Sequence, residues 1–141
     1  MTFLIKKEKV LYPDLSFKVY GICFSTHNQL GRFRSEKSYA DSIEQLLKEN
    51  NIQYKREFSL APSFVGESDR RNVVDFLIEN KIVLEIKALP VVSYKEYYQL
   101  QRYLKASKIE LGILVNFQSK YLRPKRILNT ELYSEYSDSN S

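Results

Sequence analysis

Apolar residues recur at helical spacing in three stretches of the chain, and we expect each stretch to form a helix. The first covers residues 14–30, with Asp14 as its N-cap and Gly31 as its end. The second begins near Ser35, and the third covers residues 93–107. Two helices are therefore expected before the first strand.

The first predicted helix has two apolar faces. One is a continuous aliphatic stripe, and the opposite face carries Phe17, Tyr20 and Phe24. Exposed aromatic patches commonly mark an interface, so one outcome is a homodimer through these three residues. The alternative, which we favour, is cover from within the chain, by residues 3–5 or by the C-terminal tyrosines.

Runs of apolar and alternating residues predict the strands. One strand is expected within residues 52–64, and two more form a hairpin within residues 75–88. Residues 109–117 are too apolar for anything but a central strand, and a further short strand or turn is expected within residues 121–128. The order is thus helix, helix, strand, strand, strand, helix, strand, which is that of an α/β domain.

Length and composition add a frame to this order. A chain of 141 residues suits one domain, which we place at residues 1–128, and we expect the polar residues 129–141 to be a disordered tail. Lys and Arg number 22 against 17 Asp and Glu, and the net charge of +5 suits a polyanionic partner without proving one. The single Cys23 excludes an internal disulfide, and no apolar run is long enough for a signal peptide or a membrane span. We expect a protein of the cytosol or nucleus that is not secreted.

The predicted hairpin, "DFLIENKIVLEIKA", carries charged residues where a buried sheet should have none. If its turn is centred on Asn80, then Asp75 lies opposite Glu85, and Lys87 shares their face. This register requires an odd number of loop residues, and we expect three. Asn80 or Lys81 should then adopt a left-handed backbone conformation.

Two neighbouring carboxylates repel each other and lose hydration, so the pKa of at least one should rise unless a cation compensates. Mg²⁺ or Mn²⁺ would supply that charge, polarise a phosphodiester and lower the pKa of a bound water. Lys87 could then orient that water or stabilise charge on the phosphate. The plainer alternative is that Asp75 ends a strand in solvent and that Glu85 and Lys87 form an exposed ladder.

Three further polar residues lie beside the predicted core. Glu36 falls within the apolar stripe of the second helix, although an acid in a first turn also complements the helix dipole. Gln99 and Tyr103 are four residues apart and share the margin of the third helix's stripe. They can reach a site beside the core, or they can be ordinary surface groups.

These residues together resemble the PD-(D/E)XK nuclease superfamily, whose signature is an Asp followed by E-x-K. "QLQRY" is similar to the Q-x-x-x-Y motif of its RecB-type exonuclease branch. "THNQLG", "EKSY", "VVDFLIENKIVLEIKAL", "YYQLQRYLKAS" and "LGILVNF" resemble the GxxExxY proteins, another branch, from about Leu15 to Leu128.

The resemblance implies the restriction-endonuclease-like αβββαβ core, here with an extra N-terminal helix. It implies metal-ligand roles for Glu36, Asp75 and Glu85, a catalytic role for Lys87, and supporting or substrate-contacting roles for the Gln and Tyr of the Q-x-x-x-Y motif. The function that it implies is a Mg²⁺- or Mn²⁺-dependent nuclease, acting on DNA rather than RNA. The alternative is an inactive nucleic-acid-binding or protein-interaction module that retains the fold.

The sequence departs from the GxxExxY pattern before the second helix, where Phe33 replaces the Gly three residues before Glu36. A Gly permits backbone conformations that Phe does not, so this loop must differ. Arg32 and Arg34 in the loop could contact a phosphate or could be solvated. We expect His27, a lone histidine, to be a hydrogen-bonded structural residue.

Overall fold

The computed structural model describes residues 11–62, 64–68 and 71–132. Its elements follow the predicted order: α2 (Pro13–Leu30), α3 (Glu36–Glu49), β1 (Tyr54–Ser59), β2 (Val73–Ile78), β3 (Ile82–Lys87), α4 (Tyr94–Ser107), β4 (Leu111–Asn116) and β5 (Lys125–Leu128). The five strands form one sheet in the order β1-β2-β3-β4-β5. Only β3 and β4 pair in parallel, and α4 connects them.

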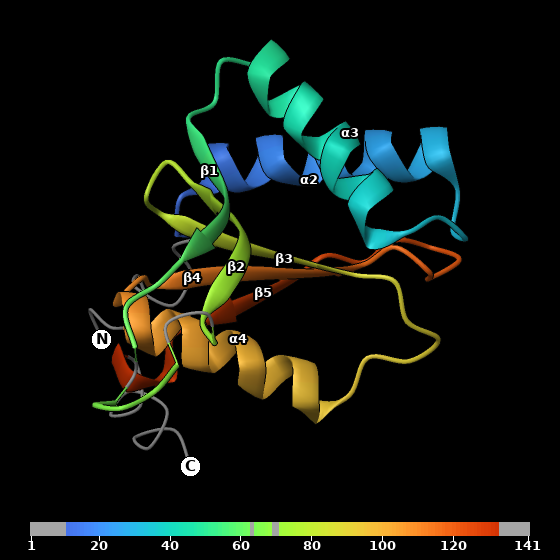
Figure 1. Ribbon diagram of the computed structural model, residues 1–141. Coiled ribbons are helices and arrows are strands. Elements are labelled where there is room, and N and C mark those ends of the chain that lie inside the picture. The colour runs from blue at the N-terminus through green and yellow to red at the C-terminus, as the bar shows by residue number, and fades with distance from the viewer. Residues whose placement is uncertain (1–10, 63, 69–70, 133–141) are drawn as a thin grey trace, which may run out of the picture.

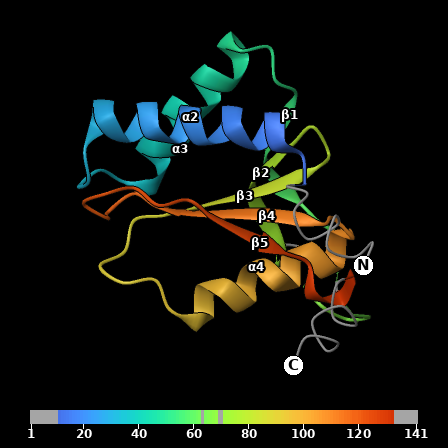
Figure 2. The ribbon, with the colours of Figure 1, turned by 180° about the vertical axis from the view of Figure 1, so that it is seen from behind.

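Three layers result, with α2 and α3 on one face of the sheet and α4 on the other (Figures 1 and 2). Along β3, Ile82, Leu84 and Ile86 belong to the core under α2 and α3, whereas Val83 belongs to the core under α4. Because both faces are covered, β3 and β4 are almost continuously buried. Gly112 in β4 allows close packing, since a Cβ there would lie 2.9 Å from the side chain of Leu100.

The helix starts differ in how well the sequence predicted them. Helix α3 begins near Ser35 as predicted, with Ser35 as its N-cap, and Ser93 begins α4 with a capping box. The predicted N-cap Asp14 is wrong: Pro13 already lies inside α2, and Tyr12 takes the cap position with a left-handed backbone. Pro at the first helical position needs no hydrogen-bond partner for its nitrogen, which explains the earlier start.

The aromatic face of α2 is largely open among the described residues. Phe17 and Phe24 are exposed, whereas Tyr20 is half-buried and packs against the core. The predicted cover, residues 3–5 and the C-terminal tyrosines, lies outside the described residues, so both intramolecular cover and the homodimer stay predictions. Neither α2 nor any other described helix is long and apolar enough to cross a membrane.

The described chain continues past the predicted domain end at residue 128. Asn129 is fully buried, and its amide nitrogen donates to Leu104 O and Ile109 O, both at 3.0 Å. A helical turn then begins at Thr130. Asn129 is thus packed rather than part of a disordered tail, because it donates to carbonyls at the end of α4 and beyond it, whereas Glu131 and Leu132 are exposed. Residues 133–141 lie outside the described residues.

Candidate active site

The β2–β3 hairpin has the register that brings Asp75 and Glu85 together. Its pairs Phe76↔Leu84 and Ile78↔Ile82 keep the predicted register, so the loop between the strands holds three residues. Asn80 has the expected left-handed backbone, at φ 55°, and Glu79 shares it at φ 54°. Side chains at Asp75 and Glu85 therefore lie one step beyond the last paired residues.

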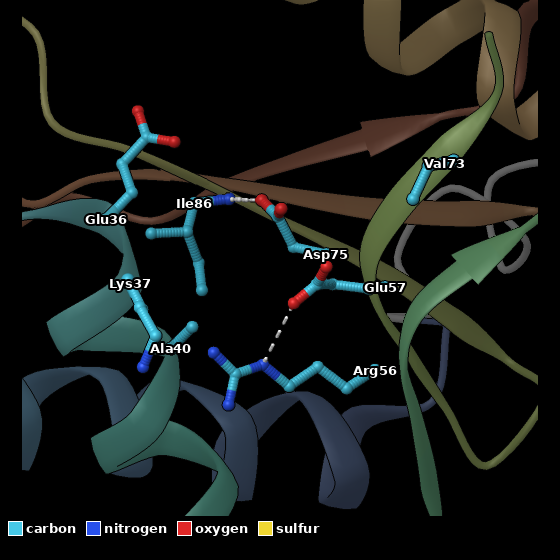
Figure 3. Close-up of a pocket in the computed structure, with 8 residues that line it drawn as sticks. All are labelled: Glu36, Lys37, Ala40, Arg56, Glu57, Val73, Asp75 and Ile86. Atoms are coloured by element: carbon cyan, nitrogen blue, oxygen red, sulfur yellow. Dashed lines mark hydrogen bonds and ion pairs between the residues drawn. The ribbon is translucent and has the colours of Figure 1, made fainter. Parts of the chain in front are cut away.

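At this point hydrogen bonds to the two carboxylates take the place of backbone–backbone hydrogen bonds between β2 and β3. Asp75 N donates to Glu85 Oε2 at 2.8 Å, and Ile86 N donates to Asp75 Oδ2 at 2.7 Å. Each acid is thereby fixed to the strand opposite its own, and Figure 3 shows the second of these bonds. The arrangement leaves Asp75 Oδ1 and Glu85 Oε1 without a donor among the described residues.

Burial makes this pair costly to ionise. Glu85 is only 3% exposed, and its burial, followed by the charge of Asp75, raises its pKa to about 8. Burial also raises the pKa of Asp75, although the hydrogen bond from Ile86 and the charge of Lys87 act in the opposite direction. The predicted rise is confirmed for both acids, and desolvation rather than mutual repulsion is its main cause.

Helix α4 brings its polar residues to the same place. Lys87 Nζ donates to Gln99 Oε1 at 2.8 Å, so the amine is held between β3 and α4. Tyr103 is buried, and its burial, together with the charge of Glu85, raises the pKa of its phenol to about 12. The phenol therefore stays protonated at neutral pH and remains able to donate a hydrogen bond.

A pocket of about 330 Å³ opens on the other side of Asp75, between α3 and strands β1 to β3 (Figure 3). Glu36 reaches it from the first turn of α3, and Glu36 Oε2 accepts from Ala88 N at 3.2 Å. Over the described ranges, no three His, Cys, Asp or Glu side chains are grouped so that they could hold a metal ion. The structure thus gathers Asp75 and Glu85 as a pair, while Glu36 lies at the pocket without completing a three-acid group.

Sequence reasoning missed Glu57, which also lines this pocket. The register Arg56↔Phe76 and Phe58↔Val74 places Glu57 across from Asp75. Its backbone is left-handed, with φ 49°, in the middle of a strand. Residues 54–59 show no break in alternation, and only the pairing with β2 reveals this residue.

At Glu57 the side chains of β1 change the face of the sheet on which they pack. Tyr54 packs on the core under α3, yet Phe58, four residues later in the same strand, packs on the core under α4. Residues four apart in a regular strand share a face, so the strand must rotate between them. On β2, Phe76 and Val74 also lie in different cores. Asp75 therefore stands where both strands change face, which opens the sheet beside it.

The loop before α3 is built around Tyr39 rather than around a glycine three residues before Glu36. Tyr39 OH donates to Gly31 O at 2.6 Å and accepts from Arg34 N at 3.1 Å, and its ring stacks on Phe117 at 4.3 Å. Arg32 Nε donates to Gln118 O at 2.9 Å. The structure therefore accounts for Arg32 and the Arg34 backbone as loop contacts and does not bring their side chains to the carboxylates.

His27 has a structural place, as predicted. Its Nε2 lies 2.9 Å from Ser119 O, which ties α2 to the loop between β4 and β5. The ring also lies 6.1 Å from the ring of Phe117.

A comparison with known families supports the arrangement. Residues 13–127 match the family model described as the PD-(D/E)XK nuclease superfamily. No curated protein and no solved structure matches the chain at a significant level. The matched range contains both carboxylates, Lys87 and the whole of α4, and with the mixed α/β sheet it confirms the predicted fold class.

Proposed function

The chain belongs to the PD-(D/E)XK nuclease superfamily, and on that premise we propose that it is a metal-dependent nuclease acting on DNA rather than RNA. The observation that carries the proposal is the pair Asp75 and Glu85, fixed across two strands with Lys87 two residues further along. We also propose that the chain belongs to the GxxExxY branch and that Gln99 and Tyr103 form its Q-x-x-x-Y motif.

The donor set fits a hard divalent cation. Asp75 and Glu85 each keep one carboxylate oxygen without a protein donor, and no ion pair in the described part of the chain neutralises either acid. Mg²⁺ and Mn²⁺ prefer such oxygen ligands. A bound Mg²⁺ or Mn²⁺ polarises the phosphodiester and lowers the pKa of a coordinated water. Glu36 and Glu57 line the adjoining pocket, from which their carboxylates could assist Asp75 and Glu85 in holding the metal.

Lys87 is the residue best placed for the attacking water. Its amine is held by Gln99 and lies close enough to both acids to lower their pKa values. From this position it can orient a water for attack on phosphorus and stabilise the negative charge that develops on the phosphate. Tyr103 supports the site from α4 with a protonated phenol.

A second function remains, an inactive module that binds nucleic acid or protein. One observation favours it: three acids are not gathered in the described residues, so a metal would rest on two carboxylates. The inactive module and the nuclease differ in whether any bond is cleaved.

Incubation of the protein with labelled plasmid, single-stranded, duplex and RNA substrates, with Mg²⁺, Mn²⁺ or EDTA, tests the proposal. We expect cleavage of DNA that requires the metal and is lost in Lys87→Ala, whose fold is checked by circular dichroism. Binding without cleavage under every condition would establish the inactive module instead.

A further inference from the structure

The outward face of α4 carries two exposed tyrosines. Tyr94 is 78% exposed and Tyr98 is 64% exposed. Their ring centroids lie 6.2 Å apart with an interplanar angle of 29°. Tyr97 is partly buried against the core, and its ring packs edge-on against the Tyr98 ring with the ring centroids 5.4 Å apart. This contact restricts the Tyr98 ring. The two open rings form a braced aromatic surface.

Cations share this face. At about 100° per residue, Lys95, Arg102 and Lys105 fall within roughly the same third of the helix circumference as the two tyrosines. The only acid of α4, Glu96, accepts from Ser93 N at 2.8 Å in the capping box. No acidic side chain in the described part of the chain pairs with the three cations.

The same helix leads from this face to the proposed active site. Gln99 follows Tyr98 directly and holds Lys87 Nζ at 2.8 Å. Tyr103 follows Arg102, which donates to Asn72 Oδ1 at 3.1 Å and is thereby fixed beside the strand that carries Asp75. Around α4, the exposed face therefore adjoins the side that carries Gln99 and Tyr103. A ligand lying along the exposed face would be close to the carboxylates.

We propose that Tyr94 and Tyr98 stack against unpaired bases of a single-stranded nucleic acid, while the neighbouring cations contact its phosphates. In a duplex the base faces are covered by stacked neighbours, so only an unpaired base can lie on a tyrosine ring. The cations supply the charge complementarity that a polyanion requires. This inference rests on the proposed nuclease function and adds the form of the substrate, a single strand or a frayed end.

Binding of labelled single-stranded and duplex oligonucleotides of one sequence, measured by fluorescence anisotropy in EDTA, tests this surface. The double variant Tyr94→Leu, Tyr98→Leu should bind the single strand about 5- to 150-fold more weakly for each base that no longer stacks, and bind the duplex almost as the wild type does. Phe17→Leu is the matched control, because Phe17 is 79% exposed on α2, across the sheet. It should leave both affinities unchanged.

Salt dependence separates stacking from charge. The tyrosine variant should keep the wild-type slope of log K against log salt, whereas Lys95→Gln with Lys105→Gln should reduce it by about 0.7 for each phosphate that is no longer neutralised. Equal weakening for single strand and duplex, or unchanged single-strand binding in the tyrosine variant, would overturn the proposal. An acidic peptide is the further probe: a tyrosine variant that binds oligonucleotides as the wild type does but no longer binds the peptide would also overturn the proposal.

The outcome also distinguishes this inference from the function on which it rests. A wild type that binds single strands through the tyrosines but cleaves nothing with Mg²⁺ or Mn²⁺ supports the surface and refutes the nuclease. A wild type that cleaves DNA, with a tyrosine variant that binds and cleaves equally well, refutes the surface alone.

Discussion

Replacing Glu85 with Gln should make the metal-free protein more stable in mild alkali, although the residue is almost fully buried. Burial and the charge of Asp75 raise the pKa of Glu85 from 4.5 to about 8. Because the folded-state pKa lies above the unfolded value, this contribution to stability is complete below pH 4.5 and is lost as the pH rises through 8. A glutamine is neutral at every pH, and its amide oxygen can still accept from Asp75 N.

A pKa shift from 4.5 to about 8 corresponds to a loss on the order of 5 kcal/mol in the free energy of unfolding of the wild type once Glu85 is ionised. Glu85→Gln does not undergo this loss. The free energy of unfolding, measured by urea titration in EDTA between pH 5 and pH 9, should therefore fall more steeply with pH in the wild type than in the variant. Glu44→Gln is the matched control, because hydrogen bonds from Tyr54 and Arg56 lower the pKa of Glu44. That change should destabilise the protein at pH 7 and matter less in acid. Parallel pH profiles for wild type and Glu85→Gln would refute the account of a buried, uncompensated carboxyl.

Three other changes test particular interactions. Lys87→Met should reduce single-turnover cleavage by about 100-fold or more while the melting temperature stays near that of the wild type, and unchanged cleavage would remove Lys87 from the mechanism. Asn129→Ala should lower the free energy of unfolding in urea by about 1 kcal/mol or more, since the carbonyl of Ile109 loses the Asn129 donor, whereas Leu104 O still accepts from Ile109 N; an unchanged midpoint would contradict this role. Glu57→Gly should raise the free energy of unfolding in urea by about 1 kcal/mol, because glycine adopts the left-handed backbone without strain. A decrease would show that the contacts of the Glu57 side chain contribute more than the strain costs.

The features that the sequence predicted are those decided by local rules. The register of the hairpin follows from side-chain alternation and an odd loop, both of which can be read within residues 75–88. Ser35 and the start of α4 follow from capping chemistry within one turn. The place of Gln99 at the margin of the helical stripe was predicted, and from there it reaches Lys87, although this particular hydrogen bond was not predicted.

The features that the sequence did not predict depend on how distant elements meet. Glu57 is adjacent to Asp75 only because β1 pairs with β2 and turns over there, and its sequence shows no interruption. The apolar stripe of α3 suggested that Glu36 faces inward, but Glu36 is exposed in the structure, and its distance to the paired acids depends on how α3 packs on the sheet. Asn129 looked like the start of a polar tail, and its burial depends on carbonyls of a helix end and a loop far away in the sequence.

The central claim, that Asp75 and Glu85 form one metal site, is tested most directly by thermal melts of wild type and Asp75→Asn with and without Mn²⁺. Without metal, the variant should be at least as stable as the wild type at neutral pH, because burial raises the pKa of Asp75 and the neutral amide avoids that cost. Mn²⁺ at a hundred times its Kd should stabilise the wild type by about 2.7 kcal/mol and leave the variant almost unchanged, which reverses their order. No stabilisation of the wild type at millimolar Mn²⁺, with the variant less stable throughout, would contradict the claim.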